Sequence, residues 1–143
     1  MKIINNFLDH SYQDYLEKVL VLGEKFPWFL NHSANFSPDN FEDYVKFNSG
    51  LPSEKEHPQF IHLLCNDETQ NSDFYPMIEK LFKSNMHMDM ERLFRVKANL
   101  TTQIPNQLKD IHGPLHIDSP HDHFETILYY VNDSDGETLF FDN

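Results

Sequence analysis

The segment Glu125-Thr-Ile-Leu-Tyr-Tyr-Val-Asn132 and the run Asp133-Ser-Asp-Gly136 that follows it carry the clearest fold signal in the chain. The first is dense in β-branched and aromatic residues, which favour extended strands. The second is rich in turn-forming residues, and its glycine can supply a positive φ. Thr138 to Phe141 then begins a returning strand. The sequence therefore predicts a β-hairpin in this part of the chain.

Upstream of the hairpin, the apolar spacing predicts two helices and several strands. Ser11 to Leu22 has helical periodicity and is followed by Gly23, which can end a helix. Ser72 to Asn85 has a second such pattern, with Ser72 placed to cap it. The shorter strand candidates are Lys2–Asn6, Phe26–Leu30, Phe60–Cys65 (or the start of a helix) and Arg92–Leu100.

This order, helices first and antiparallel strands afterwards, predicts an α+β fold, specifically a double-stranded β-helix (jelly roll) with helices packed outside it. The length of 143 residues fits one domain, over residues 1–143. We expect a helical and mixed part at 1–90 and jelly-roll strands at 91–143. An aromatic content of 14% is too high for a disordered chain.

The charge and the cysteine content narrow the classes of partner and compartment. A formal net charge of -12 repels phosphates and anionic lipids, so general nucleic-acid or membrane binding is not expected. The single cysteine, Cys65, lies in an apolar stretch and is read as a buried, inert thiol. The N-terminus lacks the apolar core of a signal peptide, and no apolar run reaches the roughly 20 residues of a membrane span. The cytoplasm is the default expectation.

The segment richest in chemistry runs from His112 to His123 and holds four histidines and two aspartates. Residues at i and i+2 of a strand face the same way, so His116 and Asp118 would point at one spot. Ferrous oxygenases hold their metal with two histidines and one carboxylate on one face of the ion. A His-x-Asp triplet alone also fits a hydrogen-bonded pair on a surface loop, and its context decides between the readings.

The context resembles the Fe(II)/2-oxoglutarate-dependent oxygenase superfamily, in its prolyl-4-hydroxylase-like branch found in phage and marine bacteria. Three stretches carry the resemblance, which covers about the last third of the chain. Phe94–Leu100 is similar to the strand before the metal motif, and Leu115–Asp118 is similar to the motif itself. Glu125–Thr138 is similar to the next strand, its hairpin and the strand after it.

The resemblance implies roles for individual residues. His116 and Asp118 would bind Fe(II). Tyr130 would reach 2-oxoglutarate with its hydroxyl, Leu128 would pack against the carbon chain of the cosubstrate, and Thr138 would line the same pocket. Tyr129 alternates to the other face of the strand and is read as core or sheet surface. The family also implies that ascorbate can support turnover.

The third metal ligand and the basic anchor for the distal carboxylate lie further downstream in the family. This chain reaches Asn143 inside an expected strand, so we expect it to be the N-terminal part of a longer reading frame. His121 and His123, and also His112, are candidates for a substitute ligand or a substrate contact. An isolated half of a jelly roll would leave strand edges unpaired.

Two function classes remain open from the sequence. One is an oxygenase that hydroxylates a prolyl or other amino-acid side chain, or a small molecule, with a small-molecule cosubstrate. The other is a non-catalytic jelly-roll or cupin-like binding module, or an inactive fragment that lacks the third ligand. The presence or absence of a downstream histidine and a basic residue distinguishes them.

Overall fold

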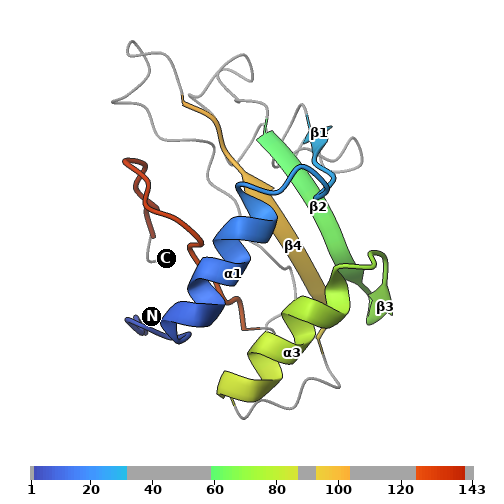
Figure 1. Ribbon diagram of the computed structural model, residues 1–143, viewed down its shortest axis with the longest axis horizontal. Helices are drawn as coiled ribbons and strands as arrows, with labels where there is room; N and C mark the ends of the chain where they lie inside the picture. The colour runs from blue at the N-terminus through green and yellow to red at the C-terminus, as the bar shows by residue number, and fades with distance from the viewer. Residues whose placement is uncertain (1, 32–58, 87–92, 104–124, 141–143) are drawn as a thin grey trace. The chain divides into compact units, whose positions relative to one another are not determined.

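The computed structural model describes residues 2–31, 59–86, 93–103 and 125–140 of the chain. These ranges contain two helices, α1 (His10–Leu20) and α3 (Tyr75–Met86), as Figure 1 shows. The strands are β1 (Phe29–Asn31), β2 (Gln59–Asn66), β3 (Thr69–Gln70) and β4 (Arg95–Leu100). The four strands form one antiparallel sheet, which confirms the predicted α+β class. These elements do not by themselves make a jelly roll.

The chain groups by its internal contacts into two compact units. The first joins Met1–Phe29 to Ile61–Asn99, and the second joins Leu30–Phe60 to Leu100–Asn143. Both described helices belong to the first unit, and so do the buried apolar residues of the core. These residues are Leu8, Leu16, Leu20, Phe26, Leu64, Cys65, Ile78 and Leu81.

Helix α1 forms where the apolar spacing predicted it, with ends that differ by one or two residues. The Asp9 carboxylate accepts a hydrogen bond of 3.2 Å from the Tyr12 backbone N–H and so caps the helix. The helix ends at Leu20 with Val21 as its C-cap, and Gly23 lies two residues further on. A Cβ at Gly23 would lie 2.5 Å from the Val19 carbonyl oxygen, so only glycine allows this close approach.

Helix α3 confirms Ser72 as its cap. The Ser72 hydroxyl accepts a hydrogen bond of 3.1 Å from the Phe74 N–H, and the Ser72 carbonyl accepts one of 3.1 Å from the Tyr75 N–H. Ile78 and Leu81, three positions apart, are buried. This spacing places them on one face of the helix. Both helices lie over one face of the sheet (Figure 1).

Strand β2 is the centre of the sheet, because β1, β3 and β4 all pair with it. This resolves the ambiguity at Phe60–Cys65 in favour of a strand. Leu64 and Cys65 are buried in it, with 2% and 0% of their surfaces exposed. Burial alternates only in part along β2, because the neighbouring residues Leu64 and Cys65 are both buried, and its sequence accordingly lacks clean alternation.

The hairpin from β2 to β3 was not predicted. It pairs Cys65 with Gln70 and Asn66 with Thr69. Its two turn residues, Asp67 and Glu68, have φ values of 48° and 60°. Two positive φ values are the geometry of a type I′ turn, which normally shows itself through a glycine. Glu68 stands where that glycine is usual, so the sequence signal was missing.

Three strand predictions were wrong. Lys2–Asn6 forms no strand, and neither does Glu125–Asn132 or the described part of Thr138–Phe141. A strand needs a neighbouring backbone to complete its hydrogen bonds, and β-favouring composition alone does not supply one. Gly136 does not take the positive φ expected for the turn. Its N–H instead donates to the Ser134 hydroxyl at 3.0 Å.

No helix among the described ranges has the length and apolar character needed to span a membrane.

The core predicts a contrast between two leucines of the first unit. Leu16→Ala should lower the free energy of unfolding by about 2–5 kcal/mol, because the Leu16 side chain is only 2% exposed and its removal leaves a cavity in the core. Leu22→Ala, at a side chain that is 71% exposed, should change it by about 0.5 kcal/mol or less. Urea denaturation followed by circular dichroism measures both. Equal changes in the free energy of unfolding for the two variants would contradict this assignment of core residues.

Candidate functional site

The predicted metal ligands, His116 and Asp118, lie outside the described residues, as do the substitute candidates His112, His121 and His123. Their roles stay predictions. The structure does describe the three residues expected to bind the cosubstrate, Leu128, Tyr130 and Thr138.

Two of these three residues are in direct contact. The Tyr130 Oη and the Thr138 Oγ1 lie 2.5 Å apart and form a hydrogen bond in which either hydroxyl is the donor. The contact spans eight residues, so the chain turns back between them, but no strands pair in 125–140 and the predicted β-hairpin does not form there. Each hydroxyl carries one proton, and the hydrogen bond between the two oxygens uses only one of these protons. The other is free to donate to an anion.

The exposure of this segment alternates in part. Leu128 and Tyr130 are 50% and 61% exposed, while Tyr129 between them is half-buried. Burial raises the pKa of the Tyr129 hydroxyl above its ordinary value. Tyr129 therefore faces a less solvated side than its neighbours, as predicted. Leu128 and Tyr130 are open to a ligand.

The charge of the segment opposes an anionic ligand. Residues 125–140 carry Glu125, Asp133, Asp135 and Glu137 and contain no lysine or arginine. A dicarboxylate such as 2-oxoglutarate would be repelled by these groups unless a cation lies nearby. The hydroxyl pair can orient such a ligand, but it cannot supply the attraction.

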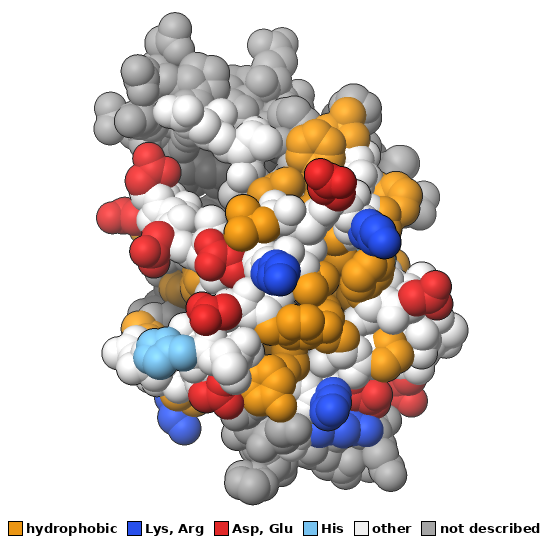
Figure 2. All heavy atoms as spheres, viewed as in Figure 1, with side chains coloured by type: hydrophobic (Ala, Val, Ile, Leu, Met, Phe, Trp, Pro, Cys, Tyr) orange, Lys and Arg blue, Asp and Glu red, His pale blue; other side chains and the backbone are white. Residues whose placement is uncertain are grey.

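Within the ranges that the structure describes, no three His, Cys, Asp or Glu side chains come together in a way that could hold a metal ion. Figure 2 shows acidic side chains spread over the visible face. Their spread fits the view that the negative charge of the described part serves solubility.

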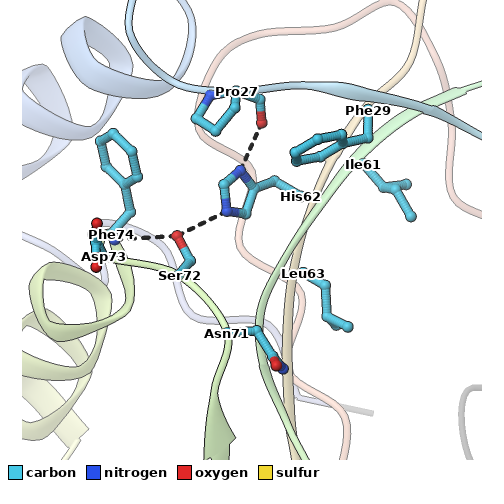
Figure 3. Close-up of a pocket in the computed structure, with 9 residues that line it drawn as sticks. All are labelled: Pro27, Phe29, Ile61, His62, Leu63, Asn71, Ser72, Asp73 and Phe74. Carbon is cyan, nitrogen blue, oxygen red and sulfur yellow. Dashed lines mark hydrogen bonds between the residues drawn. The ribbon is translucent and has the colours of Figure 1, made fainter.

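A separate hollow of about 430 Å³ lies in the first unit. Its walls are mainly apolar, and Figure 3 shows the imidazole of His62 between the Pro27 carbonyl and the Ser72 hydroxyl. The lining residues are Pro27, Phe29, Ile61, His62, Leu63, Asn71, Ser72, Asp73 and Phe74.

Both ring nitrogens of His62 have partners. Nδ1 lies 2.6 Å from the Pro27 carbonyl oxygen, and Nε2 lies 2.8 Å from the Ser72 Oγ. A carbonyl can only accept, so Nδ1 carries a proton. In the neutral ring, Nε2 is then an acceptor, and the Ser72 hydroxyl donates to it. The hydrogen-bond network thus fixes the tautomer.

Aromatic rings surround the imidazole. The ring centroids of Phe26, Phe29 and Phe74 lie 4.6, 5.7 and 6.1 Å from that of His62. Only 5% of the His62 surface is exposed. No sequence pattern connects His62 with Ser72. The two residues are ten positions apart, and only the hairpin through β3 brings them together.

Cys65 is buried, as predicted. Burial raises the pKa of its thiol, although a hydrogen bond with Tyr75 acts in the opposite direction. Burial also raises the pKa of Tyr75 to about 12, with the charge of Cys65 as the next cause. Neither group is suited to act as a nucleophile or base near neutral pH.

Comparison of the chain with family models, with curated proteins and with solved structures found no match. The geometry of the molecule and its sequence are therefore the basis for any assignment.

The Tyr75 pKa predicts a loss of stability in alkali. The folded pKa is about 12, whereas an unfolded tyrosine ionises near pH 10. The contribution of protonated Tyr75 is thus complete below about pH 10 and is lost as the pH rises towards about 12. Tyr75→Phe should flatten this decline in the free energy of unfolding, and Tyr15→Phe, at a 46%-exposed residue, should keep it. Identical pH profiles for all three proteins would contradict the assignment.

Proposed function

We propose that this chain contributes the first part of a metal site in an Fe(II)- and 2-oxoglutarate-dependent oxygenase of the prolyl-4-hydroxylase-like kind. The sequence from Leu115 to Thr138 supports the proposal through its resemblance to the motif, strand and turn of that family. The observation that carries it furthest is the hydrogen bond between Tyr130 and Thr138. The resemblance assigns both residues to one pocket, and their hydroxyls lie in contact.

In this proposal His116 and Asp118 hold the metal, and Tyr130 and Thr138 orient the cosubstrate. Fe(II) with 2-oxoglutarate, and with ascorbate to support turnover, supplies the oxidation of a substrate C–H bond by dioxygen. The second hydroxyl proton of the pair would donate to a carboxylate oxygen of 2-oxoglutarate. The exposed Leu128 side chain would pack against the methylene carbons and exclude water from them.

The acidic character of residues 125–140 makes the metal a requirement for cosubstrate binding. Four carboxylates lie in this segment without a basic residue to offset them. A divalent cation beside the pocket would reverse the local field. The proposal therefore expects 2-oxoglutarate to bind only after the metal.

The first prediction from this proposal concerns the metal. Fe(II) should bind under anaerobic conditions with a Kd on the order of micromolar, and 2-oxoglutarate should strengthen binding. His116→Ala/Asp118→Ala should abolish it. The chain offers a matched control, because His87-Met-Asp89 has the same His-x-Asp spacing. His87→Ala/Asp89→Ala should bind Fe(II) like the unmodified chain. Isothermal titration calorimetry measures all three.

The outcomes separate the alternatives. If Fe(II) binding is lost equally in the control variant His87→Ala/Asp89→Ala, histidine and aspartate side chains bind iron without a dedicated site. Loss in a His121→Ala/His123→Ala variant as well would place a third ligand in the same segment. No binding by the chain or by a longer form carrying downstream sequence would refute the oxygenase and favour the jelly-roll binding module.

The second prediction concerns the hydroxyl pair. Tyr130→Phe removes one hydroxyl, and it should weaken 2-oxoglutarate binding to the metal-loaded chain about threefold to tenfold, the value of one hydrogen bond. Fe(II) affinity in the absence of 2-oxoglutarate should stay unchanged. Tyr129→Phe, one residue away and half-buried, is the control and should leave both affinities as they are. A larger effect at Tyr129 than at Tyr130 would contradict the assignment of faces.

A further inference from the structure

The position of Ser72 allows it a chemical role in addition to capping α3. It lies between the end of β3 at Gln70 and the start of α3 at Tyr75. Its Oγ is 2.8 Å from the Nε2 of His62, and the Nδ1 of that ring is 2.6 Å from a carbonyl. A hydroxyl that donates to a base, with the base oriented by a third group, is the diagnostic arrangement of an activated nucleophile.

We propose that Ser72 is a nucleophile with His62 as its general base, and that the hollow beside them accepts small neutral carboxylic esters. The Pro27 carbonyl positions the ring in the role that a carboxylate has in serine hydrolases. Ser72 is half-buried rather than enclosed, and both residues line the hollow. This activity is independent of the iron chemistry proposed above.

The lining of the hollow defines the substrate class. Phe29, Phe74 and Pro27 offer apolar walls to an acyl chain or an aromatic alcohol. Asp73 is the only lysine, arginine, aspartate or glutamate among the nine lining residues, and its negative charge disfavours an anionic substrate. A volume of about 430 Å³ fits a small molecule and excludes a folded partner.

The reaction balances without any cofactor. The Ser72 Oγ forms a bond to the ester carbonyl carbon as its proton passes to His62 Nε2. The bond from carbon to the leaving oxygen breaks, and that oxygen takes the proton from His62. Water then repeats the steps on the acyl-serine, which releases the acid and restores Ser72.

The start of α3 holds the Ser72 hydroxyl in place. The Phe74 N–H donates a hydrogen bond of 3.1 Å to the Ser72 Oγ. The Tyr75 N–H donates one of 3.1 Å to the Ser72 carbonyl. These two bonds fix Ser72 next to His62, so the hydroxyl that donates to the imidazole is positioned before a substrate binds.

The experiment labels the intact chain with a fluorophosphonate probe and identifies the modified residue by peptide mass spectrometry. It also follows the release of p-nitrophenol from p-nitrophenyl butyrate. We expect the adduct on Ser72, and at least a tenfold lower hydrolysis rate for Ser72→Ala and for His62→Asn. The asparagine amide can still donate to the Pro27 carbonyl, so this variant removes the base while keeping that contact. Circular dichroism checks that both variants fold.

Ser134 provides a matched control. Its hydroxyl accepts a hydrogen bond of 3.0 Å from the Gly136 N–H two residues on, as Ser72 accepts from Phe74, and the structure gives it no histidine partner among the described residues. Ser134→Ala should retain labelling and hydrolysis in full. Labelling of Ser134 as strongly as Ser72, or hydrolysis that survives in Ser72→Ala and His62→Asn, would overturn the proposal. Iron binding by the same samples is measured separately, so failure of one proposal does not affect the other.

Discussion

The two hydrogen bonds of the His62 ring connect three separate parts of the first unit. The ring belongs to β2, the Pro27 carbonyl precedes β1, and Ser72 precedes α3. The segments that flank the hollow meet at this imidazole. Phe26 and Phe74 pack against the ring from the same segments, with centroid distances of 4.6 and 6.1 Å. The position of α3 over the sheet therefore depends on a polar group inside an apolar cluster.

Such a group is tolerated only because both nitrogens are satisfied. A buried polar atom without a partner costs about 1–3 kcal/mol, whereas a satisfied one contributes modestly to stability. No side-chain nitrogen or oxygen that is buried in the described residues lacks a hydrogen-bond partner. The same bonds also fix which nitrogen carries the proton. A residue that stabilises the fold in this way is, by the same geometry, prepared to accept a proton from Ser72.

The sequence predicted the elements whose signals are local. The helix at α1 followed from apolar spacing and Gly23, and the Ser72 cap followed from residue type and position. The pairings of β2 with the other strands could not be read, because partners distant in the chain decide them. The hairpin at Asp67 and Glu68 was hidden by the absence of a glycine. The strand expected at Glu125–Asn132 shows the opposite error, since its composition favours extension but the described part of the chain supplies no partner.

The candidate site was predictable to different extents for similar reasons. The assignment of Tyr130 and Thr138 to one cosubstrate pocket came from family resemblance and stays a prediction, although the structure shows that their hydroxyls are in contact. The pairing of His62 with Ser72 was not predictable, because a histidine in an apolar strand and a serine before a helix each have an ordinary structural explanation. Only the β2–β3 hairpin, which returns the chain at Asn71 towards Leu64 through a 2.9 Å backbone hydrogen bond, brings them together.

The negative charge of the chain affects the proposed oxygenase activity and the proposed ester hydrolysis differently. At a formal net charge of -12, an anionic cosubstrate meets repulsion that a metal ion must offset, and this makes the order of binding a consequence of composition. A neutral ester meets no such penalty at the hollow, where apolar contact with Phe29 and Phe74 supplies the attraction. The oxygenase chemistry should therefore respond strongly to metal and ionic strength, while ester hydrolysis at Ser72 should be nearly indifferent to both. The acidic residues that repel the anionic cosubstrate are part of the chain itself. The difference in salt dependence between oxygenase activity and ester hydrolysis therefore distinguishes the two sites even in a single preparation.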